Sequence, residues 1–483
     1  MTGGLRLLAS DSLIYGLSGV IARFLSVWLI PIYTRLFSPE DYGVLSLVQA
    51  TVAVLAMLVV LALDNSAARW YWDTEDEADR KRTVASGAVC QLAVATVVAV
   101  ALWAASDALA ARVVGRADAG AYLRLLALTL PLGQLGGVVT NWLRMRRRAV
   151  ATMVYTLGTS VLQIGSTLAF VVLWRQGLRG VYLGQVLTAV VSTVVAVALL
   201  RDWVSPAHFD ARRLREMLRY ALPLIPTGLA FWIVGFADRY FVQRFASTAE
   251  VGLYSVGSSV AGLIMLLTGA FQQAWGPFAL SIHKAADARE TYANAFLAYV
   301  TVTAVTAAGL ALLAPEAIRL VATDHYVGAS SVVGLLALGY AMVGLTYVAA
   351  TGATITKATG PVGMAITLAA VLNVALNVVL VPRWGKVGSA VATLASQAVT
   401  PVYLFHRSQQ LYRIPYRFAA GAAIYALALG LIGVGLALPL RGPAAVAAKL
   451  CLLALFLPLL GSFDLITRAR TRAWLSAVRS HAR

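Results

Sequence analysis

The sequence has few cysteines, no clustered metal ligands and little charge. Only two of its 483 residues are cysteines, Cys90 and Cys451, and both lie in apolar runs, which excludes a disulfide framework and a thiolate-rich metal site. The five histidines are scattered and form no HExxH-like pattern, so we expect neither a metal nor a cofactor. A phosphate-binding GxxxxGKS/T loop is also absent, so no ATPase is expected within this chain.

Charged residues make up only 12% of the chain, whereas hydrophobic residues make up 60%. Soluble domains are usually about 25% charged and about 45–50% apolar. One membrane-spanning helix needs about 20 apolar residues, and backbone that faces lipid must be helical. We therefore predict an all-α polytopic membrane protein with about fourteen transmembrane helices, near residues 12–34, 42–70, 83–106, 120–142, 150–173, 181–200, 220–242, 250–276, 291–314, 331–353, 361–381, 387–406, 418–438 and 446–466.

The net charge of +18 is distributed unevenly between alternate loops. With a cytoplasmic N-terminus, the inner segments hold 24 Lys and Arg residues and the outer loops hold 10. Basic residues concentrate on the cytoplasmic side of membrane proteins. We therefore predict that both termini are cytoplasmic, and that the positive charge reflects topology and not nucleic-acid binding.

A short segment recurs after 209 residues, which indicates an internal repeat. RLFSPEDYGVLS from Arg35 aligns without a gap with RFASTAEVGLYS from Arg244. Six spans separate the two copies, so both have the same orientation, as in transporters built from parallel halves. The alternative is that turns between spans generally select Gly, Ser and acidic residues.

The repeat suggests a division into three regions. Residues 1–207 form an N-terminal six-helix bundle, and residues 208–410 form a C-terminal six-helix bundle. The latter begins with an amphipathic helix at 208–221 that we expect on the inner leaflet. Residues 411–483 supply two extra helices and a basic cytoplasmic tail.

Four segments resemble those of a known transporter family. They are GVIARFLSVWLIPIYTRLFSPEDYGVLSLVQA, LPLIPTGLAFWIVGFADRYFVQRFASTAEVGLYSVG, PEAIRLVATDHYVGAS and LNVALNVVLVPRWGKVGSAVAT, within about residues 10–410. Together they resemble polysaccharide-precursor flippases of the O-antigen type, in the multidrug/oligosaccharidyl-lipid/polysaccharide exporter superfamily. The resemblance implies movement of undecaprenyl-diphosphate-linked oligosaccharide to the outer leaflet of the bacterial plasma membrane, for O-antigen or exopolysaccharide synthesis. It also implies that the last two helices form a groove for the lipid tail.

Arg23 lies near the middle of the first predicted span. An Arg at a helix centre costs about 2.5–3.5 kcal/mol on insertion scales, so it normally faces a polar cavity or a partner. A guanidinium can bind diphosphate oxygens with two parallel hydrogen bonds. The resemblance adds that relatives carry a cavity-facing Arg in this stretch. We therefore predict that Arg23 binds substrate, with a purely structural ion pair as the alternative.

Asp238 and Arg239 are adjacent charges in the seventh span, the repeat counterpart of the first. Because neighbouring residues point to different sides of a helix, we expect each to have its own environment. Arg239 is then a second substrate-binding cation, and Asp238 a ligand for a coupling H⁺ or Na⁺. The alternative is that both side chains extend to water at the outer end of the span.

Further polar residues occur at or near span ends. Asp64 is a candidate for ion coupling and Arg69 for substrate binding, although an ion pair at a helix end explains both. Lys357 is a candidate for diphosphate binding at the inner mouth or a topology determinant. Asn373 and Asn377 share one helix face and either contact sugar or form interhelical hydrogen bonds.

These features predict a transporter and not an enzyme. The preferred function is a flippase for lipid-linked oligosaccharide that works by alternating access between the two bundles. A multidrug cation antiporter of the same superfamily is the first alternative, but it calls for acidic cavity residues. A membrane glycan polymerase or ligase is the second, although such enzymes usually need a larger outer domain than these loops allow.

Overall fold

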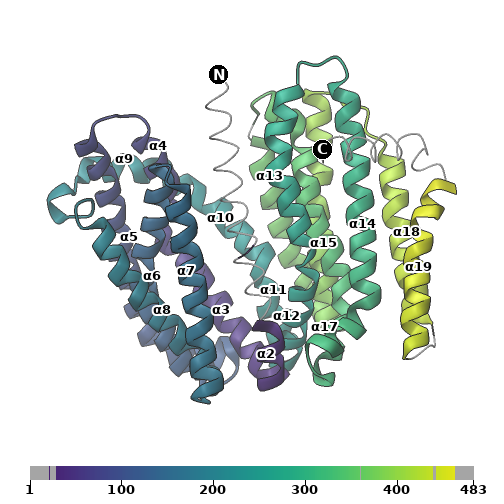
Figure 1. The fold of residues 1–483 in the computed structure, drawn as a ribbon, viewed down its shortest axis with the longest axis horizontal. Helices are drawn as coiled ribbons and strands as arrows, with labels where there is room; N and C mark the ends of the chain where they lie inside the picture. Colours follow the sequence, from purple (N-terminus) through teal and green to yellow (C-terminus); the bar gives the residue numbers. More distant parts are fainter. Residues whose placement is uncertain (1–20, 22–28, 359, 439–441, 463–483) are drawn as a thin grey trace. The chain divides into compact units, whose positions relative to one another are not determined.

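The computed structural model describes Ile21 and residues 29–358, 360–438 and 442–462. Within these ranges every regular element is a helix and none is a strand (Figure 1). The prediction of an all-α polytopic membrane protein is therefore confirmed. The chain divides into two compact units. The first comprises residues 1–255 and 377–386, and the second comprises residues 256–376 and 387–483.

The first unit contains a group of long helices that pack side by side. α5, α6 and α8 form the centre of this group, with α7 against α8 and α3 and α4 against α5 and α6 (Figure 1). Their bounds, with those of the shorter helices, are α2 Leu29–Leu36, α3 Pro39–Val60, α4 Leu63–Tyr71, α5 Glu77–Leu109, α6 Ala119–Met145, α7 Ala149–Leu168, α8 Gly177–Leu200, α9 Ala211–Ala221, α10 Ile225–Trp232, α11 Asp238–Phe245 and α12 Thr248–Ala261. Wider π-turns extend α5 and α7 and join α10 to α11.

The second unit is built around the buried helices α14 and α15. α13 packs against α15, while α18 packs against α14 and α19 against both α14 and α18. The bounds are α13 Ile264–Ile282, α14 Ala288–Val321, α15 Ser330–Ala349, α16 Thr351–Ile355, α17 Gly360–Leu411, α18 Phe418–Ala437 and α19 Pro443–Ser462. The helix α17 crosses the boundary between the units, as does α12.

The described helices account for thirteen of the fourteen predicted spans. Eleven helices are long and apolar enough to cross a membrane, and the bent pair α12–α13, with an angle of 47°, makes twelve. α17 adds another, because its 52 residues would extend about 78 Å as one helix and its backbone breaks at Gly385. The first predicted span lies almost entirely outside the described residues.

The compact units do not coincide with the predicted three regions. α9, α10 and α11 pack against α3, α4 and α5, so the first unit continues beyond residue 207. The second unit contains α18 and α19 together with α13–α15. The boundaries at residues 207 and 410 stay a prediction about the repeat.

The predicted amphipathic helix forms as α9, but its apolar face contacts protein. Met217 and Ala221 are buried together with Leu63 of α4 in one cluster. An ion pair between Arg213 and Asp79 connects α9 to α5. The helices α4 and α5 thus cover this face with an apolar surface, and the position of α9 at the inner leaflet stays a prediction.

The predicted topology places two exposed positions on opposite sides of the membrane. Each is tested by a single introduced cysteine, in a protein whose two native cysteines are replaced by alanine. We expect Ser331→Cys, at the start of α15, to react with a membrane-impermeant maleimide added outside intact cells. Glu75→Cys, in the α4–α5 connection, should react only after permeabilisation. Labelling of Glu75→Cys in intact cells would contradict the predicted orientation.

Candidate functional site

The two repeated segments begin their helices with the same local structure. Ser38 caps α3 by accepting a hydrogen bond from the Asp41 backbone N–H at 3.1 Å. Ser247, 209 residues later, accepts the equivalent bond from Glu250 N–H at 3.2 Å. A serine hydroxyl satisfies one of the free N–H groups of a helix N-terminus. The repeat therefore extends from sequence to backbone structure.

The same two helices cross in direct backbone contact. A Cβ added at Gly43 would lie 1.9 Å from the carbonyl oxygen of Thr248, and one added at Gly252 would lie 1.8 Å from that of Pro39. Pro39 and Thr248 are repeat counterparts, as are Gly43 and Gly252, so the contact is reciprocal. Reciprocal contacts are the signature of two-fold symmetry. Only glycine at both positions permits this approach.

A symmetric hydrogen bond lies next to the crossing. The hydroxyl of Ser255 donates to that of Ser46 at 2.7 Å, and these serines are also repeat counterparts. A local two-fold axis therefore passes between them. By contrast, a Cβ at Gly133 or Gly137 of the GxxxG motif in α6 meets no described atom within 4 Å.

Asp238 and Arg239 are brought together beside this axis. The Arg239 guanidinium donates to Asp238 Oδ1 at 2.9 Å, and its Nε donates to Ser46 Oγ at 3.0 Å. Tyr254 donates its hydroxyl proton to Asp238 Oδ2 at 2.5 Å. Asp238 is 3% exposed, so its charge depends on these partners.

This pairing corrects the expectation that the two residues have separate environments. The long Arg239 side chain folds back along its helix, where it also donates to the Gly235 carbonyl at 2.9 Å. Its guanidinium carbon lies 5.1 Å from the centre of the Phe236 ring. The flexibility of the side chain therefore overcomes the angular separation of neighbouring helical positions. Asp238 and Arg239 form one unit with Ser46 and Tyr254.

Ion pairs surround the N-terminal ends of α3 and α12. Arg116, between α5 and α6, donates to Asp41 at 2.7 Å and to Asp118 at 2.6 Å. Its hydrogen bonds lower the pKa of the Asp118 carboxyl, which lies between two spans. In the second repeat copy, Lys386 donates to Glu250 at 2.9 Å. The two counterpart acids, Asp41 and Glu250, are thus each neutralised by a cation that comes from a different part of the chain.

Asp64 lies just after a break in a predicted span. Leu61 and Ala62 both have positive φ, 51° and 54°, and separate α3 from α4. The amide of Gln91 donates to the carbonyl of Val60 and to Asp64 Oδ1, both at 3.1 Å. Irregular backbone at membrane depth persists only where protein or a polar cavity satisfies its polar groups. Gln91 satisfies this requirement here.

The structure places Arg69, Lys357 and Asn373 outside these clusters. Arg69 is exposed and pairs with Asp73, not with Asp64. Lys357 is exposed, with a φ of 60°, in the link before α17. Asn373 is fully buried and donates to Ser396 at 3.1 Å, an interhelical bond between the two arms of α17. Asn377 is also fully buried, and Arg23 lies outside the described residues.

The reciprocal crossing predicts an unusual response to alanine. Gly43→Ala and Gly252→Ala should each lower the free energy of unfolding by about 1–3 kcal/mol, because each Cβ forces the helices apart. The double variant should lose less than the sum, since one separation relieves both clashes. Gly133→Ala, which meets open space, is the control. Denaturant unfolding of the purified protein measures all four, and strict additivity would contradict a shared contact.

Comparisons with known proteins agree with this architecture. A family model described as "Polysaccharide biosynthesis protein" matches residues 8–283, more than half of the chain. The succinoglycan biosynthesis transport protein ExoT of Rhizobium meliloti (strain 1021) is 25% identical over 321 residues. The alignment covers 64% of this chain and 61% of that relative's length.

Solved structures of transporters share the fold. The inward closed conformation of the lipid II flippase MurJ superposes with a TM-score of 0.74 at 12% identity, covering 94% of this chain and 100% of the other. An inward-facing multidrug transporter of the MATE family, in the MOP superfamily, gives 0.69 at 17% identity and covers 83% and 96%. These relatives are transporters and not enzymes, as expected for this chain. The chain belongs to the polysaccharide biosynthesis protein family and has the fold of the transporters of the MOP superfamily.

Proposed function

We propose that this protein is a flippase that carries undecaprenyl-diphosphate-linked oligosaccharide across the bacterial inner membrane by alternating access. The observation that carries the proposal is the partly buried cation Arg239 beside the local axis that relates the two repeated segments, in a chain of this family. A cation held within a span of the first unit suits an anionic head group that must cross the membrane. The succinoglycan transport relative supports an exopolysaccharide precursor as cargo.

The chemistry of the diphosphate accounts for the role of Arg239. Its guanidinium binds a carboxylate, Asp238, and a diphosphate likewise offers pairs of oxygen acceptors to a guanidinium and carries more charge. In the proposed cycle the diphosphate replaces Asp238 as the partner of Arg239. Arg23 is the proposed second cation, and Arg69 and Lys357 are proposed contacts during loading. Asn373 and Asn377 are proposed contacts of the sugar.

A multidrug cation antiporter is the second candidate, because the fold also matches that of a multidrug transporter. An organic cation would need a carboxylate that is free to receive it. Asp238 already bonds Arg239 and Tyr254, and Asp64 bonds Gln91. The anionic cargo is therefore better supported by these contacts.

The proposal predicts that flipping depends on Arg239. The assay uses vesicles that contain the protein and a fluorescent polyprenyl-diphosphate oligosaccharide, and measures lipid that becomes accessible in the opposite leaflet. A charged hydrogen bond contributes about 1.5–3 kcal/mol, so Arg239→Ala should weaken substrate binding about ten- to a hundredfold. Arg239→Lys should give an intermediate value, since it keeps the charge but loses the paired donors.

Two variants separate binding from folding. Arg239→Ala leaves Asp238 buried without its cation, so Arg239→Ala with Asp238→Asn removes both charges and restores neutrality. Arg244→Ala, an exposed position on the same helix, is the matched control and should flip at the normal rate. Normal flipping by the folded double variant would remove Arg239 from the proposed substrate site.

The proposed coupling acids give a separate prediction. If Asp238 or Asp64 exchanges H⁺ or Na⁺ during transport, its replacement by Asn should abolish acceleration by an imposed gradient of that ion. The amide keeps the size and most hydrogen bonds but cannot titrate or carry charge. The initial flipping rate is measured with and without each gradient. Equal acceleration in both variants and in the unaltered protein would exclude these acids as coupling groups.

A further inference from the structure

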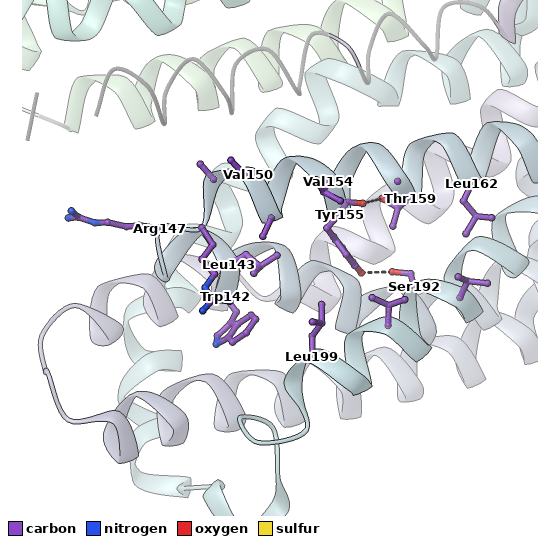
Figure 2. A pocket seen from close by; sticks show the side chains of 16 residues that line it. Trp142, Leu143, Arg147, Val150, Val154, Tyr155, Thr159, Leu162, Ser192 and Leu199 are labelled. Atoms are coloured by element: carbon purple, nitrogen blue, oxygen red, sulfur yellow. Dashed lines mark hydrogen bonds between the residues drawn. The ribbon is translucent and has the colours of Figure 1, made fainter. Parts of the chain in front are cut away.

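A groove of about 900 Å³ lies in the first unit, between α7, α8 and the end of α6. Figure 2 shows Arg147 at one end of this groove and Leu162 at the other, with Val154, Tyr155 and Ser192 between them. The walls are largely apolar. Tyr155 and Ser192 are the main polar exceptions, and their hydroxyls bond each other at 2.6 Å. The groove therefore offers a mostly apolar surface along its length.

An exposed tryptophan and a cluster of arginines place the arginine end of the groove at a membrane surface. Trp72 is 50% exposed, and the guanidinium carbon of Arg147 lies 5.0 Å from its ring centre. Arg146 and Arg80 lie beside it and stack on the buried rings of Trp142 and Tyr71, at 5.1 and 4.8 Å. Trp and Tyr concentrate where membrane meets water, and basic residues join them on the cytoplasmic side. This end of the groove therefore lies at the level of lipid head groups.

The groove is long enough for a complete lipid chain. Leu162 follows Arg148 by fourteen residues, which corresponds to about 21 Å along the helix. The hydrocarbon core of a bilayer is about 30 Å thick, so one leaflet contributes about 15 Å. A chain that enters at the arginine end therefore fits within the groove without leaving its own leaflet.

The arginine end carries positive charge that no acidic side chain in the described part of the chain neutralises. Arg147 and Arg148 are exposed, and no described acidic side chain forms an ion pair with either. Glu77, near the neighbouring hollow, pairs with Lys81 instead. Arg147 is also held at a φ of 53°, a conformation that non-glycine residues rarely adopt. The geometry thus presents two cations at the mouth of an apolar groove.

We propose that this groove binds one anionic phospholipid of the inner leaflet. Its phosphate lies between Arg147 and Arg148, and one acyl chain extends along α7 and α8 toward Leu162. Basic pockets between transmembrane helices on the cytoplasmic side are suited to anionic head groups. The site lies wholly within the first unit and is independent of which cargo the protein carries. Such a lipid would fill the space between α7 and α8 and stabilise this unit.

Native mass spectrometry tests the proposal with matched variants. The protein is reconstituted in vesicles of equal parts phosphatidylglycerol and phosphatidylcholine, extracted in mild detergent and weighed with its retained lipid. We expect one phosphatidylglycerol molecule to be retained in preference to phosphatidylcholine. Arg147→Gln and Arg148→Gln should each weaken retention about fivefold, the effect of one basic residue near a membrane surface. Arg215→Gln, an exposed charge on α9 away from the groove, should leave retention unchanged.

Two tryptophan substitutions on α7 distinguish lipid binding in the groove from general contact with lipid. Gly158 lines the groove and Gly165 does not, yet both lie on α7 and a Cβ at either meets no described atom within 4 Å. Gly158→Trp should therefore abolish retention, whereas Gly165→Trp should not. Equal retention by these two folded variants, or equal retention of phosphatidylcholine, would overturn the proposal. Displacement by equimolar polyprenyl phosphate would also overturn it, because the groove would then belong to the carrier lipid.

Discussion

The contact between α3 and α12 at Gly43 and Gly252 determines the arrangement of the polar groups around it. Each glycine faces a carbonyl oxygen of the opposite helix so closely that no side chain fits. The close approach of α3 and α12 lets Ser255 donate a hydrogen bond to Ser46. Ser46 in turn accepts a hydrogen bond from Arg239. A wider crossing would break the serine contact and leave the partly buried guanidinium of Arg239 without one acceptor. Helix packing and electrostatics are therefore coupled at the repeat axis.

Three cations at or within the spans of the described structure are each paired with an acid. Arg239 is paired with Asp238, Lys386 with Glu250 and Lys449 with Glu316, the last at 2.6 Å. A buried charge without a partner is costly in lipid, and truncating one member of a pair leaves the other stranded. Arg147 and Arg148 differ because both side chains are exposed, and no described acidic side chain forms an ion pair with either. The location of a cation thus decides whether the protein or its surroundings must neutralise it.

The sequence predicts the features that rest on repeated local patterns. Apolar runs indicated the spans, and the matched segments at Arg35 and Arg244 indicated the two helices that cross. It did not predict the break at Leu61 and Ala62, since neither residue is the glycine or proline that usually marks one. Nor did it predict that Arg239 folds back onto Asp238 or that Gln91 joins Asp64, because both depend on side-chain conformation and tertiary contact. Ser46 and Ser255 were visible as repeat counterparts, but only the crossing explains their role.

The pairing of Asp238 with Arg239 constrains any cycle in which Arg239 binds a diphosphate. Breaking a buried pair by removing one partner costs about 3–5 kcal/mol, so the guanidinium cannot leave the carboxylate without compensation. In such a cycle the incoming diphosphate would compensate Arg239, and a proton or cation would compensate Asp238. The two events stabilise each other, and linkage requires that each raises the affinity for the other by the same factor. In the proposed flippase, coupling of cargo to an ion therefore needs no distant pathway, because one shared salt bridge suffices.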